Sequence, residues 1–147
     1  MGSAQFFTVP AGGTYISNDV VNHPALTYEA LGVLVHMLAM HPARPKTIET
    51  LTGRGLGRRA VRNALACLEA AGFRWRFKYS REDGQWCTAV ILSPLPMSEH
   101  EAFLSVVQFV TQDGKLSVKQ WLAADNTPLT REGIRPAHTD IPVTDSR

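Results

Sequence analysis

The sequence predicts an α+β fold in which a core of three helices precedes a β-hairpin and a C-terminal extension that is expected to be helical. Apolar residues recur at helical spacing through residues 28–71. After Gly72 the apolar pattern changes to strict alternation, and Asp83-Gly84 divides the alternating region as a hairpin turn would. With 147 residues the chain is long enough for one domain with a proper core.

The N-terminal region predicts a strand or arm over residues 1–14, followed by the first core helix. The apolar piece "FFTV" runs into "PAGG", which is a strong turn signal. Thr27 is a good N-cap, and Glu29 places an acid in the first turn, where the helix dipole favours it. We expect a helix over 28–40 that Pro42 closes, and its almost wholly apolar surface predicts a central packing helix.

Two further helices are predicted on either side of a glycine-containing turn. Thr47 caps a short helix that Gly53 ends. "RGLG" then forms the turn, and the helix over 58–71 stops at Gly72. The apolar stripe of this longer helix consists of Val61, Ala64, Leu65 and Leu68.

The hairpin is predicted over 73–92, with aromatic and basic residues alternating in "FRWRFKYSR". We interpret the aromatic face of Trp75, Phe77 and Tyr79 as core in preference to a stacking platform for single-stranded nucleic acid. Trp75 and Trp86 are candidates for a cross-strand pair.

"PLP" at 94–96 marks the boundary of the C-terminal extension. Ser98 and Glu101 form a capping box that predicts a helix in "SEHEAFLSVVQFVT", with a second hairpin as the alternative. "SVKQWLAAD", with Ser117 as its cap, predicts a further short helix. The expected organisation is therefore an arm at 1–14, a main domain at 15–93, an extension at 94–125 and a flexible tail at 126–147.

Positive charge is concentrated in one quarter of the chain. Residues 44–81 carry ten of the fifteen Lys and Arg residues against two acids, although the net charge of the whole chain is only +2. A concentrated basic segment in a nearly neutral protein is typical of a protein that binds a polyanion. The alternative is a solvated face that happens to be rich in arginine.

The two helices around the glycine turn predict a helix-turn-helix, and the basic hairpin after them predicts its wing. A rotation of about 100° per residue turns Arg59, Arg62 and Asn63 away from the apolar stripe, and these residue types suit contacts to guanine and adenine edges. The candidate phosphate contacts lie around the preceding helix and on the hairpin. They are Lys46, Thr47, Arg54 and Arg58, with Arg76, Lys78 and Arg81 in the wing.

The run "GLGRRAVRNALACLEAAGF", together with "TIETL" before it and the hairpin after it, resembles winged helix-turn-helix domains of actinobacterial and phage proteins. The similarity covers about residues 15–93. It implies a DNA-binding fold whose recognition helix is 58–71 and whose wing is 73–92. The link between Leu51 and Val61 departs from that pattern because it is slightly shorter and has an additional glycine.

Other chemistries find little support in the sequence. The G-x-G-x-G spacing lacks the lysine of a phosphate-binding loop, and the five His and two Cys residues have no metal-ligand spacing. We therefore expect no cofactor, no metal and no enzymatic activity. Without a signal peptide or a membrane-spanning run, and with two widely separated cysteines, the chain is expected to be cytoplasmic and associated with the nucleoid.

These observations predict a sequence-specific regulator of transcription that binds double-stranded DNA, most simply as a homodimer on two half-sites. A possible protein partner is assigned to residues 98–125. Two alternatives stay open, namely a plasmid or phage replication or maintenance protein that uses the same DNA contacts, and an interaction module that binds a protein of the transcription machinery.

Overall fold

A computed structural model of the chain describes residues 4–8, 14–41, 44–112 and 114–130. They form a mixed α+β structure whose single five-stranded sheet has the order β1-β3-β2-β4-β5. The elements are β1 (Ala4–Thr8), α1 (Asn18–Val21), α2 (Tyr28–Ala39), α3 (Ile48–Leu51), α4 (Arg58–Ala70), β2 (Arg74–Arg81), β3 (Trp86–Leu92), α5 (Glu99–Thr111), β4 (Val118–Ala123) and β5 (Pro128–Leu129). The predicted α+β class is therefore confirmed.

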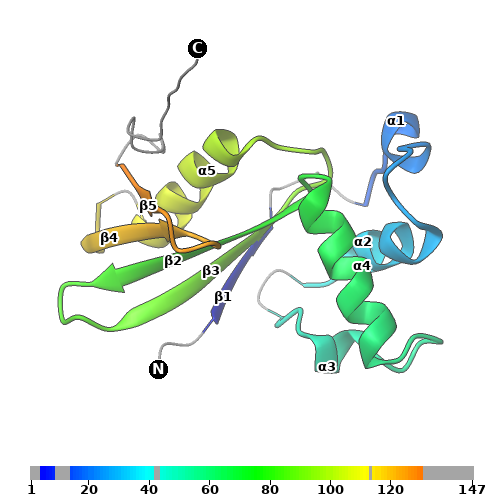
Figure 1. Cartoon of the computed structure of the whole chain (residues 1–147), viewed down its shortest axis with the longest axis horizontal. Coiled ribbons are helices and arrows are strands. Elements are labelled where there is room, and N and C mark those ends of the chain that lie inside the picture. Colours follow the sequence, from blue (N-terminus) through cyan, green and yellow to red (C-terminus); the bar gives the residue numbers. More distant parts are fainter. Residues whose placement is uncertain (1–3, 9–13, 42–43, 113, 131–147) are drawn as a thin grey trace, which may run out of the picture.

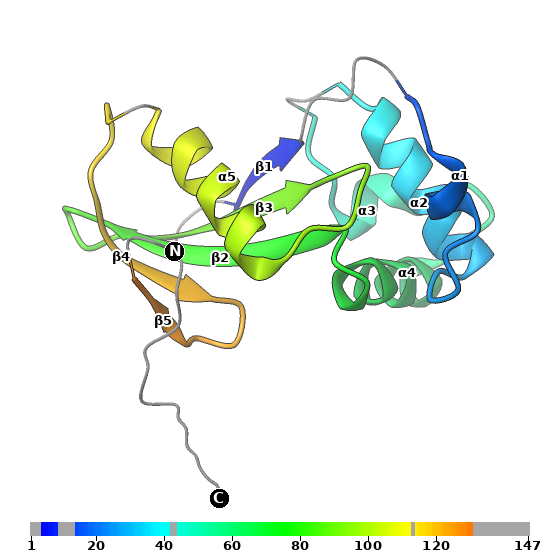
Figure 2. The same cartoon turned by 90° about the horizontal axis from the view of Figure 1, so that it is seen from above.

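The helices fall into two groups around the sheet. Helices α1 to α4 gather at one end of the β2–β3 hairpin, and α5 lies along one face of the sheet (Figures 1 and 2). Strand β1 pairs in parallel with β3, whereas the β2–β3, β2–β4 and β4–β5 pairs are antiparallel. The hairpin thus lies inside the sheet, with β2 as its central strand.

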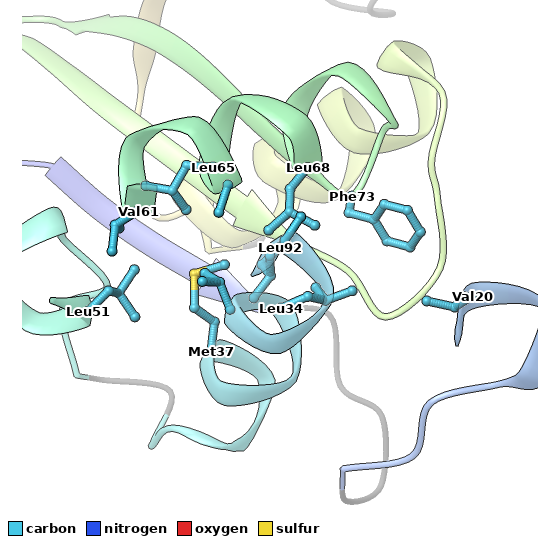
Figure 3. Close-up of a cluster of buried hydrophobic side chains, with 12 residues drawn as sticks. Val20, Leu34, Met37, Leu51, Val61, Leu65, Leu68, Phe73 and Leu92 are labelled. Atoms are coloured by element: carbon cyan, nitrogen blue, oxygen red, sulfur yellow. The ribbon is translucent and has the colours of Figure 1, made fainter. Parts of the chain in front are cut away.

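The first hydrophobic core lies between α2 and α4 (Figure 3). Leu34 and Met37 of α2 meet Val61 and Leu68 of α4, and all four side chains are almost completely buried. The predicted N-cap of α2 is confirmed, because the Thr27 side chain accepts a hydrogen bond from the Ala30 N–H at 3.0 Å. The predicted helices 28–40 and 58–71 are thus confirmed to within one residue, whereas the short helix α1 was not expected from the sequence.

The second core lies between α5 and the sheet. Phe77 and Tyr79 of β2 pack against Phe103 of α5 and Trp121 of β4, which confirms the prediction that the aromatic face of β2 is core. Burial raises the pKa of Tyr79 to about 12, with Cys87 contributing, and the Tyr79 hydroxyl donates to the Gln5 side chain of β1. The tyrosine thereby ties β1 to the centre of the sheet.

The structure corrects the sequence predictions at the C-terminal side. The helix predicted from the Ser98–Glu101 capping box is present as α5, so the alternative hairpin there is wrong. The predicted short helix in "SVKQWLAAD" is wrong, since that segment is β4, paired with β2. The apolar residues of this segment fit helical spacing locally. The segment instead pairs as a strand with the free edge of β2, and this pairing accompanies the burial of Trp121 and Ala123.

Two smaller predictions are also wrong. The expected tail begins with ordered structure, because Pro128–Leu129 form β5 and Leu129 is buried, whereas residues 131–147 lie outside the described part of the chain. Trp75 and Trp86 are not a cross-strand pair. Trp75 faces Ile91 and Trp86 faces Ser80, so the two indoles are on opposite faces of the sheet.

The two cores meet at the short connection between the end of α4 and the start of β2, residues 71–73, which we call the joint. Gly72 has a φ of +89°, and the Phe73 N–H returns to the Leu68 carbonyl at 2.9 Å to close the helix, as a C-terminal glycine motif does. The Met97 N–H donates to the Gly72 carbonyl at 2.9 Å, and the Trp75 indole N–H donates to the same carbonyl at 3.1 Å. A Cβ on residue 72 would lie 2.9 Å from the Met97 carbonyl oxygen.

We expect Gly72→Ala to lower the free energy of unfolding by roughly 2–3 kcal/mol, because it adds both a left-handed strain and a backbone clash. Gly32→Ala is the matched control, since its site lies inside α2 with no heavy atom within 4 Å of the added Cβ. The control should raise the free energy of unfolding by roughly 0.5–1 kcal/mol through helix propensity. Urea unfolding of both variants measures the difference, and equal effects would contradict the role given to Gly72.

Candidate nucleic-acid interface

The glycine turn sets the angle between α3 and α4. Gly53 and Gly55 have φ values of +98° and +88°, and the Gly53 N–H donates to the Leu56 carbonyl at 3.2 Å. Leu56 of this turn packs against the first core. Gly57 has an ordinary negative φ and is the N-cap of α4, so no side chain caps this helix. The glycines therefore form the turn between the two helices, and no N-cap side chain accepts from the first backbone N–H groups of α4.

Helix α4 presents the three candidate base-reading residues on one exposed face. Arg59, Arg62 and Asn63 are exposed, whereas Val61 and Leu65 on the same stretch of α4 are buried. The first turn of α4 contains no acidic residue. This arrangement of the apolar and polar faces is the one predicted from the helical spacing.

The structure does not place Lys46 where a phosphate contact would lie. Its side chain is almost fully buried, with 3% exposed, and its ammonium group donates to the Arg44 carbonyl at 3.1 Å and the His41 carbonyl at 3.5 Å. Burial lowers the pKa of Lys46. We therefore interpret Lys46 as a structural group that holds the α2–α3 connection, and we correct its assignment to a phosphate-binding role.

The other candidates around α3 lie nearer the surface. Thr47 is the N-cap of α3, and its side chain accepts from the Thr50 N–H at 3.3 Å within a capping box. Arg58 donates to the Glu49 carboxylate at 3.1 Å, with both side chains more than half exposed. Hydrogen bonds from the backbone of Glu49 and from Arg58 lower the pKa of the Glu49 carboxyl. Arg54 is exposed in the glycine turn.

Glu69 of α4 joins the helix to two arginines of β2, a contact that the local sequence pattern does not indicate. Its carboxylate pairs with Arg74 and accepts from Arg76 at 3.2 Å. Burial lowers the pKa of Arg74, and the charge of Glu69 opposes that shift. Arg76 keeps half of its side chain exposed, whereas Arg74 is 11% exposed. Arg74 is therefore a structural partner of Glu69, and Arg76 is available at the surface.

The remaining hairpin candidates lie apart from one another. Lys78 shares the face of Arg76 and donates to the Asn126 side chain at 2.6 Å. Arg81 lies at the end of β2, next to the acidic residues Glu82 and Asp83 of the turn. The hairpin tip therefore carries more negative than positive charge, and the β2 side chains that contact α4, Arg74 and Arg76, lie further along the strand.

A groove of about 480 Å³ separates the sheet from helices α3 and α4. Arg62 of α4 and Arg76 of β2 line it from opposite sides, with Phe6 of β1 and Val90 of β3 on the sheet side. The structure thus brings Arg62 and Arg76 to one concave surface, and leaves Arg81 outside it.

Comparisons with protein-family models, with curated proteins and with solved structures found no match for the chain. None of the described helices is long and apolar enough to cross a membrane. Within the described ranges, no group of three or more His, Cys, Asp or Glu residues could hold a metal ion.

We expect Glu69→Gln to lower the free energy of unfolding by roughly 2–3 kcal/mol, because Arg74 would keep its charge in a mostly buried position without a carboxylate partner. Glu49→Gln is the matched control, since it removes the same charge from the exposed pair with Arg58. Solvent screens that pair, so the control should unfold at nearly the wild-type urea concentration. If the two variants unfold alike, Glu69 does not anchor α4 to β2.

Proposed function

We propose that the chain is a winged helix-turn-helix protein that binds double-stranded DNA in a sequence-specific manner and regulates transcription. In this proposal α2, α3 and α4 are the three-helix core, α4 is the recognition helix, and β2–β3 is the wing. The observation that carries the proposal is the exposed face of α4, where Arg59, Arg62 and Asn63 stand together on a helix whose opposite face is buried.

These three side chains suit the major groove. Arginine can make paired hydrogen bonds to the N7 and O6 atoms of guanine, and asparagine can do so with the N6 and N7 atoms of adenine. They lie in the N-terminal half of α4, which is the part of a recognition helix that meets base edges in this class of motif. The small Ala66 on the same exposed side lets the helix approach the bases closely.

The phosphate contacts come from the rim of this face. Arg54 is exposed in the glycine turn before α4, Arg76 on the sheet lines the groove beside α4, and the N-terminus of α4 without a side-chain cap favours an anionic group. Arg58 would exchange its exposed partner Glu49 for a phosphate, which costs little because exposed ion pairs contribute little. Thr47, the N-cap of α3, is a further candidate for a phosphate contact.

A homodimer would give the regulator two recognition helices for two half-sites. The apolar face of α5 is buried against the sheet of its own chain, so a partner would meet the outer face of residues 98–125. A replication or maintenance role would use the same contacts. Sequencing of genomic fragments bound to the purified protein separates the two roles, because a regulator should enrich dispersed promoter sites and a replication protein one origin-like locus.

The salt dependence of binding is the first test. We expect the affinity for a selected duplex to fall steeply as salt rises from about 50 to 200 mM, because each neutralised phosphate releases counterions. Fluorescence anisotropy of a labelled duplex measures it. Absence of duplex binding at about 50 mM salt, or an affinity that does not change with salt, would rule out direct DNA binding.

The second test separates base reading from phosphate binding. Arg59→Ala should cost roughly 1–3 kcal/mol on the selected sequence and reduce the preference over a scrambled duplex. Arg76→Ala should weaken both duplexes alike and reduce the slope of affinity against salt. Lys115→Ala removes an exposed charge from the turn after α5, far along the chain from α4, and should leave both affinities unchanged. If all three variants bind like the wild type, the assignment of contacts is wrong.

A further inference from the structure

The sheet has a second face that α5 does not cover. Alternation along the strands places Arg76 and Lys78 of β2 on the side opposite Phe77 and Tyr79, which pack against α5. The register puts their cross-strand neighbours on that same side. We call this surface the open face. Its residues include Phe6, Arg76, Lys78, Trp86 and Thr88, together with Val90, which is itself buried.

The open face carries two aromatic side chains that belong to neither core. Trp86 is 42% exposed, whereas Trp75 and Trp121 are part of the second core. Phe6 is partly exposed and lines the groove, next to its register partner Val90. Trp86 lies four residue steps from Val90 along β3, which corresponds to about 13 Å along the sheet. The two aromatic rings thus mark two ends of one surface.

Basic side chains lie between and beside these two aromatic residues. Arg76 and Lys78 project from the neighbouring strand, and Arg62 faces the groove from α4. Among the described residues that line the groove, the one acid is Glu69, and Arg74 and Arg76 both pair with it. The excess of positive charge lies in the groove and along β2, whereas at the hairpin tip beside Trp86 the acids Glu82 and Asp83 outnumber Arg81. The two exposed rings and the basic groove between them complement a flexible polyanion that carries planar groups.

We propose that the open face binds single-stranded nucleic acid, with bases stacked on Trp86 and Phe6 and the sugar–phosphate backbone following Arg76, Lys78 and Arg62. Exposed aromatic rings combined with a basic groove form the usual surface for binding single strands without sequence preference. A duplex lacks exposed base faces and would not use the two rings. The open face borders the exposed side of α4 at Arg62, so an unpaired strand here would continue from the proposed duplex site.

Trp86 supplies a direct readout for this proposal. An oligothymidylate of about twelve nucleotides, titrated into the wild-type protein at low salt, should bind and quench the tryptophan fluorescence, because Trp86 is the exposed indole. Trp86→Phe should keep nearly full affinity and lose the quenching, since a phenylalanine ring still stacks. Trp86→Ala should bind about 5- to 10-fold more weakly, as expected for the loss of one base–aromatic stack.

Phe6→Ala should weaken oligothymidylate binding by a similar factor at the other end of the surface. Leu104→Ala is the matched control, because Leu104 is 47% exposed on α5, the helix on the covered face of the sheet. Circular dichroism and urea unfolding establish that each variant is folded. If oligothymidylate does not bind at about 50 mM salt, or if Trp86→Ala and Phe6→Ala both bind like the wild type, the proposal is overturned.

The same set of proteins separates this inference from the proposed duplex recognition. Asn63→Ala on α4 should weaken binding to the selected duplex and leave oligothymidylate binding unchanged. If no duplex binds but oligothymidylate quenches Trp86, then the proposed regulatory function fails and the single-strand surface stands. If duplex binding depends on Asn63 but oligothymidylate does not bind, the single-strand surface fails alone.

Discussion

The joint between α4 and β2 is the constraint on which the rest of the structure depends. Gly72 reverses the chain in a conformation that other residues rarely adopt, and its carbonyl accepts from Met97 and Trp75. Glu69, in the last turn of α4, forms ion pairs with Arg74 and Arg76 of β2. Because β2 is the central strand of the sheet, these few contacts set the position of α4 against all five strands.

The two hydrophobic cores are connected through the two hairpin strands that continue from this joint. Phe73 and Leu92, at the base of the hairpin, belong to the helical core, whereas Phe77 and Ala89, further along the same strands, belong to the core under α5. The hairpin therefore runs through both cores. The two proposed binding surfaces would need a fixed connection between the cores, since recognition loses affinity when the contacting groups are free to move.

Several candidate contacts could be predicted from the sequence because they depend on local rules. Helix periodicity separates Arg59 and Asn63 from the buried stripe of α4, and any amphipathic helix obeys the same geometry. The caps at Thr27 and Ser98 satisfy the first N–H groups of their own helices, so they need no tertiary partner. The positive φ values of Gly53 and Gly72 likewise follow from helices that must end there.

Only the tertiary structure decided the features that depend on distant neighbours. Residues 118–123 have apolar spacing that also fits a helix, and they became β4 because β2 offered an unpaired edge. Lys46 is buried and donates to backbone carbonyl oxygens, and Arg74 forms an ion pair with Glu69. In the sequence, both residues look the same as the other basic residues of this segment. Sequence periodicity thus assigns residues to a face of an element, but packing between elements determines whether that face meets solvent.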